Sequence, residues 1–400
     1  MKNTGTEEHG QAMDYEMTAT TMYGLEEVLA EELLKLGARE ISTHNRIVNF
    51  TGDKGFMYKA NLSLRTALKV LVPIHRFIAN NEQRLYDGIK QIDWNEYLEK
   101  DNTLAVEATL NTDNFNHSQF VAQKTKDAIV DQFRDKFGVR PNVDLQHPTV
   151  KINVHIFRDE VTVSLDSSGP SLYKRGYRED TNLAPLKEVL AAGMIILSGW
   201  DRRTTFIDPM CGSGTLLTEA ALMANNIPPG YFRQEFGFMK WKNFDKALWD
   251  TIYESAINKI TDHQQTIIGI DISSNVLKKA RENIKNCKAE DIVKVQCADF
   301  FEFEPPKTRG TVIINPPYGE RMDKDGDVTV LYKKIGDKLK KDFSGYTAWI
   351  ISSNAEAIKH IGLRPTRKIT LYNGALECKF LKFELYEGTK KIHKLEKNKE

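Results

Sequence analysis

Long apolar runs are missing from this 400-residue chain. A helix that crosses a membrane needs roughly 18 or more apolar residues in a row, so the sequence predicts no membrane span. The first residues, Met1–Gly5, carry no hydrophobic signal core. We expect them to be a frayed polar leader.

Cysteine is scarce as well, with four in the whole chain. The spacing matches no metal site, so we expect no bound metal. Unpaired thiols in a chain of this length favour a reducing compartment, and the predicted location is the cytoplasm. The four residues are Cys211, Cys287, Cys297 and Cys378.

A strong charge of either sign is also absent, since the formal net charge is +1. Any affinity for nucleic acid must therefore come from local basic patches. Two phosphate-binding patterns are missing too. The glycines at Gly212 and Gly214 are not followed by Lys, which excludes a P-loop, and their spacing differs from the G-x-G-x-x-G of NAD enzymes.

The sequence does contain a stiff turn after an apolar strand-like run. The run Gly310–Ile314 ends in Asn315-Pro316-Pro317-Tyr318. The two prolines fix φ and remove backbone donors, which leaves the Asn315 side-chain oxygen and the Pro316 carbonyl as two convergent acceptors. Two such acceptors can hold both hydrogens of a planar amino group, and the Tyr318 ring offers a stacking face. The motif predicts a grip on an exocyclic amine.

A second pattern upstream predicts a ligand site beside that grip. A strand-like run, Thr204–Ile207, leads into the glycine turn Asp208–Thr215 and then a helical pattern. Glycine in a strand-to-helix turn lets a ligand approach the backbone. Two further strand-like runs end in Asp271 and in Asp299-Phe300. An acid at a strand end suits ribose hydroxyls, and Asp-Phe suits the edge and face of an adenine.

Length and pattern predict at least two domains. Residues up to about 165 mix strands and helices in an α+β block. From Thr204 onward strands alternate with helices, which predicts a mostly parallel doubly wound sheet, and the pair Lys368–Tyr372 and Lys379–Tyr386 predicts an antiparallel edge hairpin. A long aromatic-rich insertion, about Ile227–Trp249, interrupts this alternation and mostly predicts packing.

The order of these motifs resembles the class I S-adenosylmethionine-dependent methyltransferases that modify amines. The amino-terminal block resembles a ferredoxin-like segment followed by a THUMP RNA-binding domain, in Gly24-Leu25-Glu26, Ala60–Ala67 and Asn116–Phe120. The connector Lys174–Arg178 followed by Ala184–Lys187 resembles the joint of the same family. The whole chain is thus similar to bacterial THUMP-domain guanine-N2 methyltransferases of 23S ribosomal RNA, of the Asn-Pro-Pro-Tyr type.

The resemblance implies a fold and a set of domains. It implies an α+β amino-terminal region, ferredoxin-like plus THUMP, and a Rossmann-like α/β class I methyltransferase domain. The expected parts are residues 15–165 for the RNA-binding region, 166–185 for a basic linker, 186–387 for the methyltransferase domain and 388–400 for a disordered charged tail. The chain ends after one catalytic domain, whereas the longest members of the family carry a second fused methyltransferase.

The resemblance also assigns residues to roles. Asn315, Pro316, Pro317 and Tyr318 hold the target base. S-adenosylmethionine is the expected cofactor, and its expected contacts are Asp208, Cys211, Gly212, Gly214, Thr215, Asp271, Ile272, Asp299, Phe300, Asn315, Pro185 and Leu186. Basic side chains are expected to contact RNA phosphates, namely Lys174, Arg175, Arg178 and Arg321. The implied partner is 23S rRNA or a pre-50S particle, bound by a monomer.

Other functions fit the same residues. The acceptor pair of Asn315 and Pro316 also fits the N6 amine of adenine in RNA or DNA, and the side-chain amide of a protein glutamine. A non-catalytic RNA-binding factor in ribosome assembly would carry the same amino-terminal block. The THUMP-like half favours RNA, but the residues do not choose the base.

Overall fold

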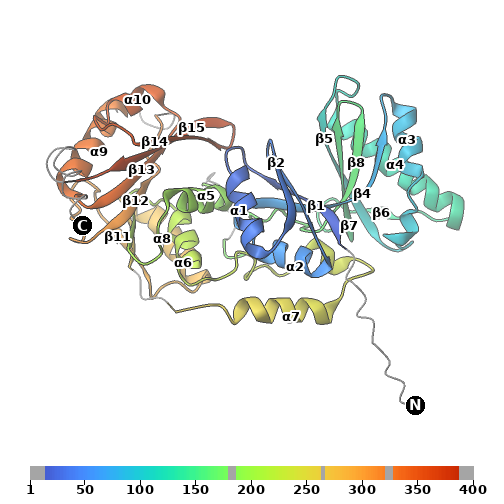
Figure 1. Ribbon diagram of the computed structural model, residues 1–400, viewed down its shortest axis with the longest axis horizontal. Helices are drawn as coiled ribbons and strands as arrows, with labels where there is room; N and C mark the ends of the chain where they lie inside the picture. Colours follow the sequence, from blue (N-terminus) through green and yellow to red (C-terminus); the bar gives the residue numbers. More distant parts are fainter. Residues whose placement is uncertain (1–13, 179–185, 263–265, 320–327, 387–400) are drawn as a thin grey trace, which may run out of the picture.

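The structure is a computed structural model that describes residues 14–178, 186–262, 266–319 and 328–386. The described residues form an elongated molecule with a large sheet toward each end (Figure 1). The carboxy-terminal sheet lies at one end, and the ferredoxin-like part of the amino-terminal sheet lies between it and the outer part (Figure 1). None of the helices in these residues has the length and apolarity needed to cross a bilayer.

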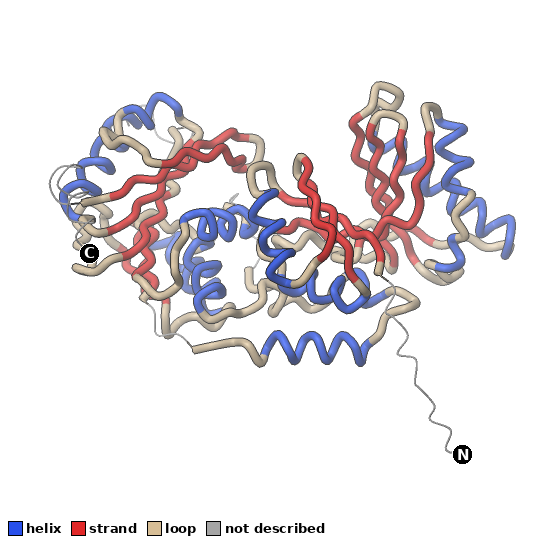
Figure 2. Tube along the Cα trace, viewed as in Figure 1, coloured by secondary structure: helices blue, strands red, loops and turns tan. Residues whose placement is uncertain are grey.

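The amino-terminal half is built on one continuous eight-stranded sheet with the order β2-β3-β1-β4-β8-β7-β5-β6. The strands are β1 (Tyr15–Thr21), β2 (Arg39–His44), β3 (Ile47–Gly52), β4 (Ala67–Ile78), β5 (Thr103–Asn111), β6 (Asn142–Val143), β7 (Val150–Phe157) and β8 (Glu160–Asp166). The helices are α1 (Glu26–Leu36), α2 (Lys54–Ser63), α3 (Glu82–Lys90), η1 (Trp94–Glu96) and α4 (Ser118–Phe137). Figure 2 shows α3 and α4 packed beside the outer strands.

Strand β4 joins the two parts of this sheet. It has 12 residues, and its first half pairs with β1 while its second half pairs with β8. The register shifts between Pro73 and His75, where proline cannot donate a ladder hydrogen bond. The ferredoxin-like segment and the domain after it therefore share one strand instead of being linked by a loop.

The carboxy-terminal half is a seven-stranded sheet with the order β11-β10-β9-β12-β13-β15-β14. The strands are β9 (Thr205–Asp208), β10 (Ile267–Asp271), β11 (Val293–Cys297), β12 (Gly310–Ile314), β13 (Tyr346–Ser352), β14 (Arg367–Asn373) and β15 (Leu376–Glu384). The strands from β9 to β13 pair in parallel, whereas β14 and β15 are antiparallel. The predicted mostly parallel sheet with an antiparallel edge hairpin is confirmed.

Helices cover both faces of this sheet. One apolar core joins the strands to α5 (Glu188–Ser198), α6 (Thr215–Ala224) and α8 (Ser274–Asn286). The other joins them to α9 (Val328–Asp342) and α10 (Ala355–Lys359). Because the strand residues alternate between the two cores, the sheet is buried on both sides, as parallel sheets require.

The aromatic insertion forms part of the core between the two halves. It contains η2 (Gly237–Lys240) and leads into α7 (Lys246–Ile257), a helix that the sequence pattern did not predict. Phe236, Phe238 and Trp249 are buried against α2 and the strands of the ferredoxin-like segment. The predicted packing role of these aromatics is confirmed, and the insertion fastens the carboxy-terminal half to the amino-terminal one.

Part of the connector between the halves is buried, which corrects one prediction. Arg175 was expected to contact RNA, but its side chain is 1% exposed. Its guanidinium pairs with Glu219 at 3.2 Å and donates to the carbonyls of Leu172 and Arg65. An arginine with its donors bound inside the protein cannot reach a phosphate. The RNA-binding prediction for Arg175 is therefore wrong.

A charged network surrounds Arg175 at the contact between the halves. Arg65 lies just before β4, and its guanidinium donates to the carbonyl of Ile227 at 2.7 Å. Glu32 of α1 accepts from the backbone N–H groups of Arg65 and Thr66, each at 2.9 Å. Burial raises the pKa of Glu32 and lowers the pKa of Arg65 to about 10. The network ties the ferredoxin-like segment to α6.

Candidate active site

The predicted cofactor and base contacts among the described residues, with the exception of Gly214, line one cavity at the carboxyl ends of the parallel strands. The cavity has a volume of about 670 Å³, within the usual range for small-ligand sites. Carboxyl ends of neighbouring parallel strands meet at one sheet edge, which brings distant segments together. The lining includes Leu186, Asp208, Cys211, Gly212, Thr215, Asp271, Ile272, Asp299, Phe300 and the segment Asn315–Tyr318.

The glycine turn between β9 and α6 has the backbone shape that the sequence predicted. Gly212 and Gly214 both have left-handed backbones, with φ of +53° and +80°. Gly214 is the residue before the first turn of α6, and no side chain caps that helix. A side chain at Gly214 would press on Ala280 of α8, at 3.2 Å. The Gly214 N–H donates to the Cys211 carbonyl at 2.8 Å, so the turn is held by its own backbone and lacks side chains at both glycines.

Asp271 at the end of β10 fixes the glycine turn. Its Oδ2 accepts from the backbone N–H of Gly212 at 2.9 Å, and its Oδ1 accepts from the N–H of Ser273 at 2.9 Å. Each carboxylate oxygen has a second lone pair, so both can still accept hydrogen bonds from a ligand. The side chain thus positions the turn and remains an acceptor at the cavity wall.

Asp208 at the end of β9 is the buried acid of the site. It is 2% exposed and accepts from the N–H of Met210 at 3.3 Å. Burial, with a smaller effect from the nearby Asp271, raises the pKa of Asp208 to about 8. The carboxyl group therefore carries a proton at neutral pH in the free protein.

The side expected to hold an adenine is apolar. Ile272 lines the cavity and is 75% exposed, so its apolar side chain is open to a ligand. Phe300 also lines the cavity, but it is 3% exposed and packs on Phe301 and Phe343. The sequence prediction missed Phe301, which lines the cavity beside Phe300.

The turn after β12 lies on the opposite wall and differs from the sequence expectation in one respect. The Asn315 oxygen was expected to be free, but it accepts from the Tyr318 hydroxyl at 2.7 Å. Burial raises the pKa of Tyr318, which keeps this hydroxyl a donor. The amide oxygen keeps one further lone pair. The Tyr318 carbonyl accepts from Asn354 Nδ2 at 3.0 Å, which holds the turn against the start of α10.

The tip of the edge hairpin completes this wall. Asn373 and Leu376, at the turn between β14 and β15, line the cavity next to Tyr318. Cys378 Sγ lies 3.9 Å from the Tyr318 hydroxyl. The sequence prediction missed these residues because they follow the target-binding motif by more than fifty positions. The Asn-Gly pair at Asn373-Gly374 predicts a hairpin turn but not its place beside the cavity.

Arg178 lies behind the glycine turn, which corrects a second prediction. The side chain is 13% exposed, pairs with Glu188 of α5 at 3.1 Å and donates to the Thr215 hydroxyl. Burial raises the pKa of Glu188. Arg178 is therefore turned inward, and its predicted phosphate contact is wrong. Lys174 is exposed and stays a prediction, whereas Pro185, Arg321 and the tail 388–400 lie outside the described residues.

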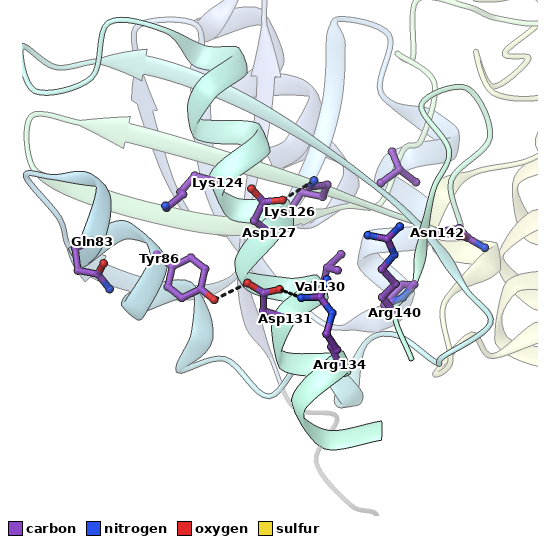
Figure 3. A pocket seen from close by; sticks show the side chains of 12 residues that line it. Gln83, Tyr86, Lys124, Lys126, Asp127, Val130, Asp131, Arg134, Arg140 and Asn142 are labelled. Carbon is purple, nitrogen blue, oxygen red and sulfur yellow. Dashed lines mark hydrogen bonds and ion pairs between the residues drawn. The ribbon is translucent and has the colours of Figure 1, made fainter. Parts of the chain in front are cut away.

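A second hollow lies far from this cavity, between α3, α4 and the loop before β6. It has a volume of about 640 Å³. Figure 3 shows the Tyr86 hydroxyl and Arg134 both directed to Asp131, with bonds of 2.8 Å and 2.9 Å. Arg140 and Lys124 line the same hollow. Asp127 and Asp131 lie among its basic side chains, so this hollow is a mixed polar surface.

The chemistry of the first cavity fits S-adenosylmethionine. Asp271 and Asp299 offer acceptors for hydroxyl and amino groups, Ile272 and Phe301 offer apolar contact for a base, and the glycine turn admits close approach. Asp208 would lie near the ammonium group of the methionine part of S-adenosylmethionine. The turn Asn315–Tyr318 lines the same cavity, so a bound cofactor and a molecule held by this turn would lie close together.

Three parts of the chain match known domain families. Residues 175–382 match the RMKL-like methyltransferase domain. Residues 79–166 match the THUMP domain, and residues 16–71 match the RlmL ferredoxin-like domain. Together these matches follow the two halves of the structure.

Curated proteins are similar over most of the chain. A Synechocystis sp. protein assigned to the RNA methyltransferases is 41% identical over 369 residues, covering 92% of this chain and 96% of that protein. The ribosomal RNA large subunit methyltransferase K/L of Syntrophotalea carbinolica is 40% identical over 387 residues, covering 92% of this chain and 53% of that enzyme. This chain thus spans about half the length of the K/L enzymes that it matches.

Solved structures are similar over the same span. SMU.472, assigned as a methyltransferase and solved with SAH (S-adenosylhomocysteine), superposes with a TM-score of 0.83 at 30% identity, over 94% of this chain and 99% of that one. A Listeria monocytogenes protein assigned as an N6-adenine-specific DNA methylase gives a TM-score of 0.83 at 29% identity, over 93% and 97% of the two chains.

Proposed function

Because the chain belongs to the family of RMKL-like methyltransferases, we propose that it methylates the exocyclic N2 amine of a guanine in 23S ribosomal RNA. Its cofactor is S-adenosylmethionine, since a structural relative over almost the whole chain is bound to SAH. The observation that carries the proposal is a single cavity. Asn315 and Tyr318 line it together with Gly212 and Asp271.

The residues of the turn would activate the amine. When bound, S-adenosylmethionine supplies an electrophilic methyl group on a sulfonium. The lone pair of a guanine amine is delocalised into its ring. Hydrogen bonds from the amine to Asn315 Oδ1 and the Pro316 carbonyl would return density to the nitrogen, and they strengthen as positive charge develops there. The amine proton would leave to water.

Tyr318 would change partners when the base enters. Its hydroxyl now bonds to the Asn315 oxygen, which is the acceptor that the amine needs. The base either shares that oxygen through its second lone pair or displaces the hydroxyl. Tyr318 would then stack on the base and offset part of the few kcal/mol needed to extrude it from a helix.

The substrate is inferred from the accompanying domains and from named relatives. The amino-terminal half matches a THUMP domain, and K/L relatives are named for large-subunit ribosomal RNA. The Listeria relative is named for adenine N6 in DNA, and the acceptor pair of Asn315 and Pro316 fits that amine too. The choice of guanine N2 over adenine N6 as the methylated amine therefore needs a direct test.

The test is transfer of a labelled methyl group to defined substrates. Purified protein, labelled S-adenosylmethionine and 23S rRNA from a strain that lacks the enzyme should yield N2-methylguanosine after nuclease digestion and mass spectrometry. A parallel reaction with pre-50S particles compares naked RNA with an assembling particle. Labelled N6-methyladenosine, or label in a protein fraction alone, would contradict the proposal.

Binding of the cofactor should release a proton near neutral pH. Asp208 is protonated below a pH of about 8 in the free protein. A nearby ammonium group would favour its ionised form, so affinity should rise with pH up to about 8, by at most about tenfold per pH unit. Calorimetry of SAH binding at pH 7, in buffers of different ionisation enthalpy, should detect the proton.

Asp208→Asn is the control for that measurement. The variant keeps the other ionisable side chains that line the same cavity, Asp271, Asp299 and Cys211. The proton released by the wild type should disappear in the variant, and the rise of affinity with pH should flatten. Equal proton release in both proteins would show that the proton comes from elsewhere.

Substitution of Arg178 should lower the affinity for the cofactor and leave the affinity for RNA unchanged. Arg178→Ala removes the hydrogen bond to Thr215 and leaves Glu188 without its ion pair. Loss of a hydrogen bond to a charged group amounts to about 1.5–3 kcal/mol, so SAH should bind at most about 10–150-fold more weakly. Binding of an rRNA fragment without cofactor should stay unchanged. Lys174→Ala, on the exposed side of the connector, is the matched control and should show the reverse pattern.

A further inference from the structure

The ferredoxin-like segment touches the methyltransferase domain next to the target wall. A Cβ on Gly24, in the loop between β1 and α1, would lie 2.5 Å from the carbonyl oxygen of Thr370 in β14. A Cβ on Gly193 of α5 would likewise lie 2.5 Å from Cδ2 of the next residue, Leu25. Figure 1 shows this meeting point, where the tip of the β14–β15 hairpin reaches α1. The two domains are in direct backbone contact there.

Three side chains form a continuous strip along this contact. The ring of Tyr23 meets the ring of Tyr372 edge to face, with centroids 5.3 Å apart. The guanidinium of Arg46, from the turn between β2 and β3, lies 6.0 Å from the Tyr372 ring centroid. Tyr23 is 41% exposed, and Arg46 is exposed. We call Tyr23, Arg46 and Tyr372 the junction strip.

One carboxylate fixes the backbone under the junction strip. Glu26 accepts from the N–H of Gly24 at 2.7 Å and from the N–H of Arg46 at 2.9 Å. Arg46 has a φ of +60°, a left-handed conformation that is unusual for arginine. Such strain persists where surrounding contacts impose it, and it clusters at functional sites. The backbone of the strip is thus held in place, while the side chains of Tyr23 and Arg46 are exposed and that of Tyr372 is half-buried.

The acids beside the junction strip are already engaged. The Glu26 carboxylate is bound to two backbone donors. Glu377 pairs with Lys379 and accepts from the Tyr372 hydroxyl at 3.3 Å. These partners reduce the repulsion that a phosphate would meet. Arg46 remains a cation available to an anion.

An exposed turn of two small residues links the junction strip to the cavity. Asn373, which lines the cavity, follows Tyr372 directly in β14. The next two residues, Gly374 and Ala375, form the exposed hairpin tip, and a Cβ on Gly374 would meet nothing within 4 Å. A chain leaving the cavity can pass over this tip and reach the strip on the other face of β14.

We propose that the junction strip binds the single-stranded RNA that flanks the target nucleotide, with Tyr23 and Tyr372 contacting bases and Arg46 contacting a phosphate. The inference rests on RNA as the substrate. Aromatic rings and an arginine in a row are the side chains that bind unstacked nucleotides. The ferredoxin-like segment would then contact the substrate, and the methyltransferase would prefer a target in a loop over one inside a duplex.

The test uses substitutions at two positions, Tyr23 and Arg46, chosen to preserve the backbone conformation. Tyr23→Ala removes a stacking ring, and Tyr23→Phe keeps it. Arg46→Asn removes the cation, and asparagine tolerates the left-handed conformation. Base stacking on an aromatic is worth about 1–3 kcal/mol, so Tyr23→Ala should raise KM for 23S rRNA roughly 10–100-fold. Arg46→Asn should reduce the salt slope of RNA binding by about 1.

Control measurements distinguish a loss of RNA binding at the junction strip from a loss of stability or of cofactor binding. SAH affinity and the denaturation midpoint should match the wild type, and Tyr23→Phe should keep a KM near the wild-type value. Arg364→Asn removes an exposed arginine beyond the opposite end of β14 and should change nothing. An unchanged KM in Tyr23→Ala and an unchanged salt slope in Arg46→Asn would overturn the inference, as would parallel losses in stability.

A direct measurement of RNA binding distinguishes failure of this inference from failure of the proposed function. A mixed-sequence single-stranded oligoribonucleotide, measured by fluorescence anisotropy, should bind the wild type about tenfold more tightly than Tyr23→Ala. A duplex of the same sequence should show no such difference. If the wild type methylates no RNA but this difference holds, the proposed function fails and the strip stands. If the difference is absent while methylation proceeds, the strip fails alone.

Discussion

Asn315→Ala should lower the rate of methyl transfer by about 10²–10³-fold and leave SAH binding close to that of the wild type. The substitution removes an acceptor that bonds the amine most strongly in the transition state, and loss of one such preorganised group typically costs that factor. Asn315 follows β12 at the cavity wall, and its side chain now accepts from Tyr318. Single-turnover rates with 23S rRNA and calorimetry with SAH measure the two quantities.

Asn315→Asp is the matched variant, because a carboxylate keeps an oxygen acceptor at the same place. It should retain far more activity than Asn315→Ala. Equal loss in both variants would mean that the amide N–H₂ group, and not the oxygen, is needed. An alanine variant with normal turnover would remove Asn315 from the chemistry.

Glu219→Ala should destabilise the protein by about 3–5 kcal/mol, because it leaves a buried cation without its partner. Arg175 is 1% exposed and Glu219 is fully buried, with an N–O distance of 3.2 Å. Glu219 also accepts from the Tyr177 hydroxyl at 3.4 Å. Urea titration followed by fluorescence should show a clear fall in the midpoint of unfolding.

Two companion variants define the cause. The double substitution Arg175→Met with Glu219→Leu removes both charges, so it should recover much of the lost stability. Glu356→Ala breaks the exposed pair with Lys359 and should change stability by less than about 1 kcal/mol. A Glu219→Ala midpoint equal to that of Glu356→Ala would mean that water reaches Arg175.

The sequence predicted the carboxy-terminal fold well because its signals are local. Short apolar runs that end in Asp208, Asp271 and Asn315 mark parallel strands, and each lies within a residue or two of its expected place. Helix α7 was missed because it follows an aromatic stretch whose packing partners lie in the other half. Local pattern does not reveal which distant surface a segment will cover.

The sequence predicted where the backbone turns lie but not where two long charged side chains point. Gly212 and Asp271 lie at the cavity as the strand order requires. Arg175 and Arg178 follow a turn and resemble an exposed basic linker, yet both face inward toward acids that occur later in the chain. The partner acids, Glu219 and Glu188, belong to helices whose positions only the fold defines.

Strand β4 has a consequence for how this protein can be divided. Its first half completes the sheet of residues 16–71, and its second half completes that of residues 79–166. Dividing the gene between these two regions would separate half of β4 from the strand that pairs with it. The exposed, unpaired backbone groups would favour aggregation. The two amino-terminal modules should therefore be expressed, melted and exchanged as one piece.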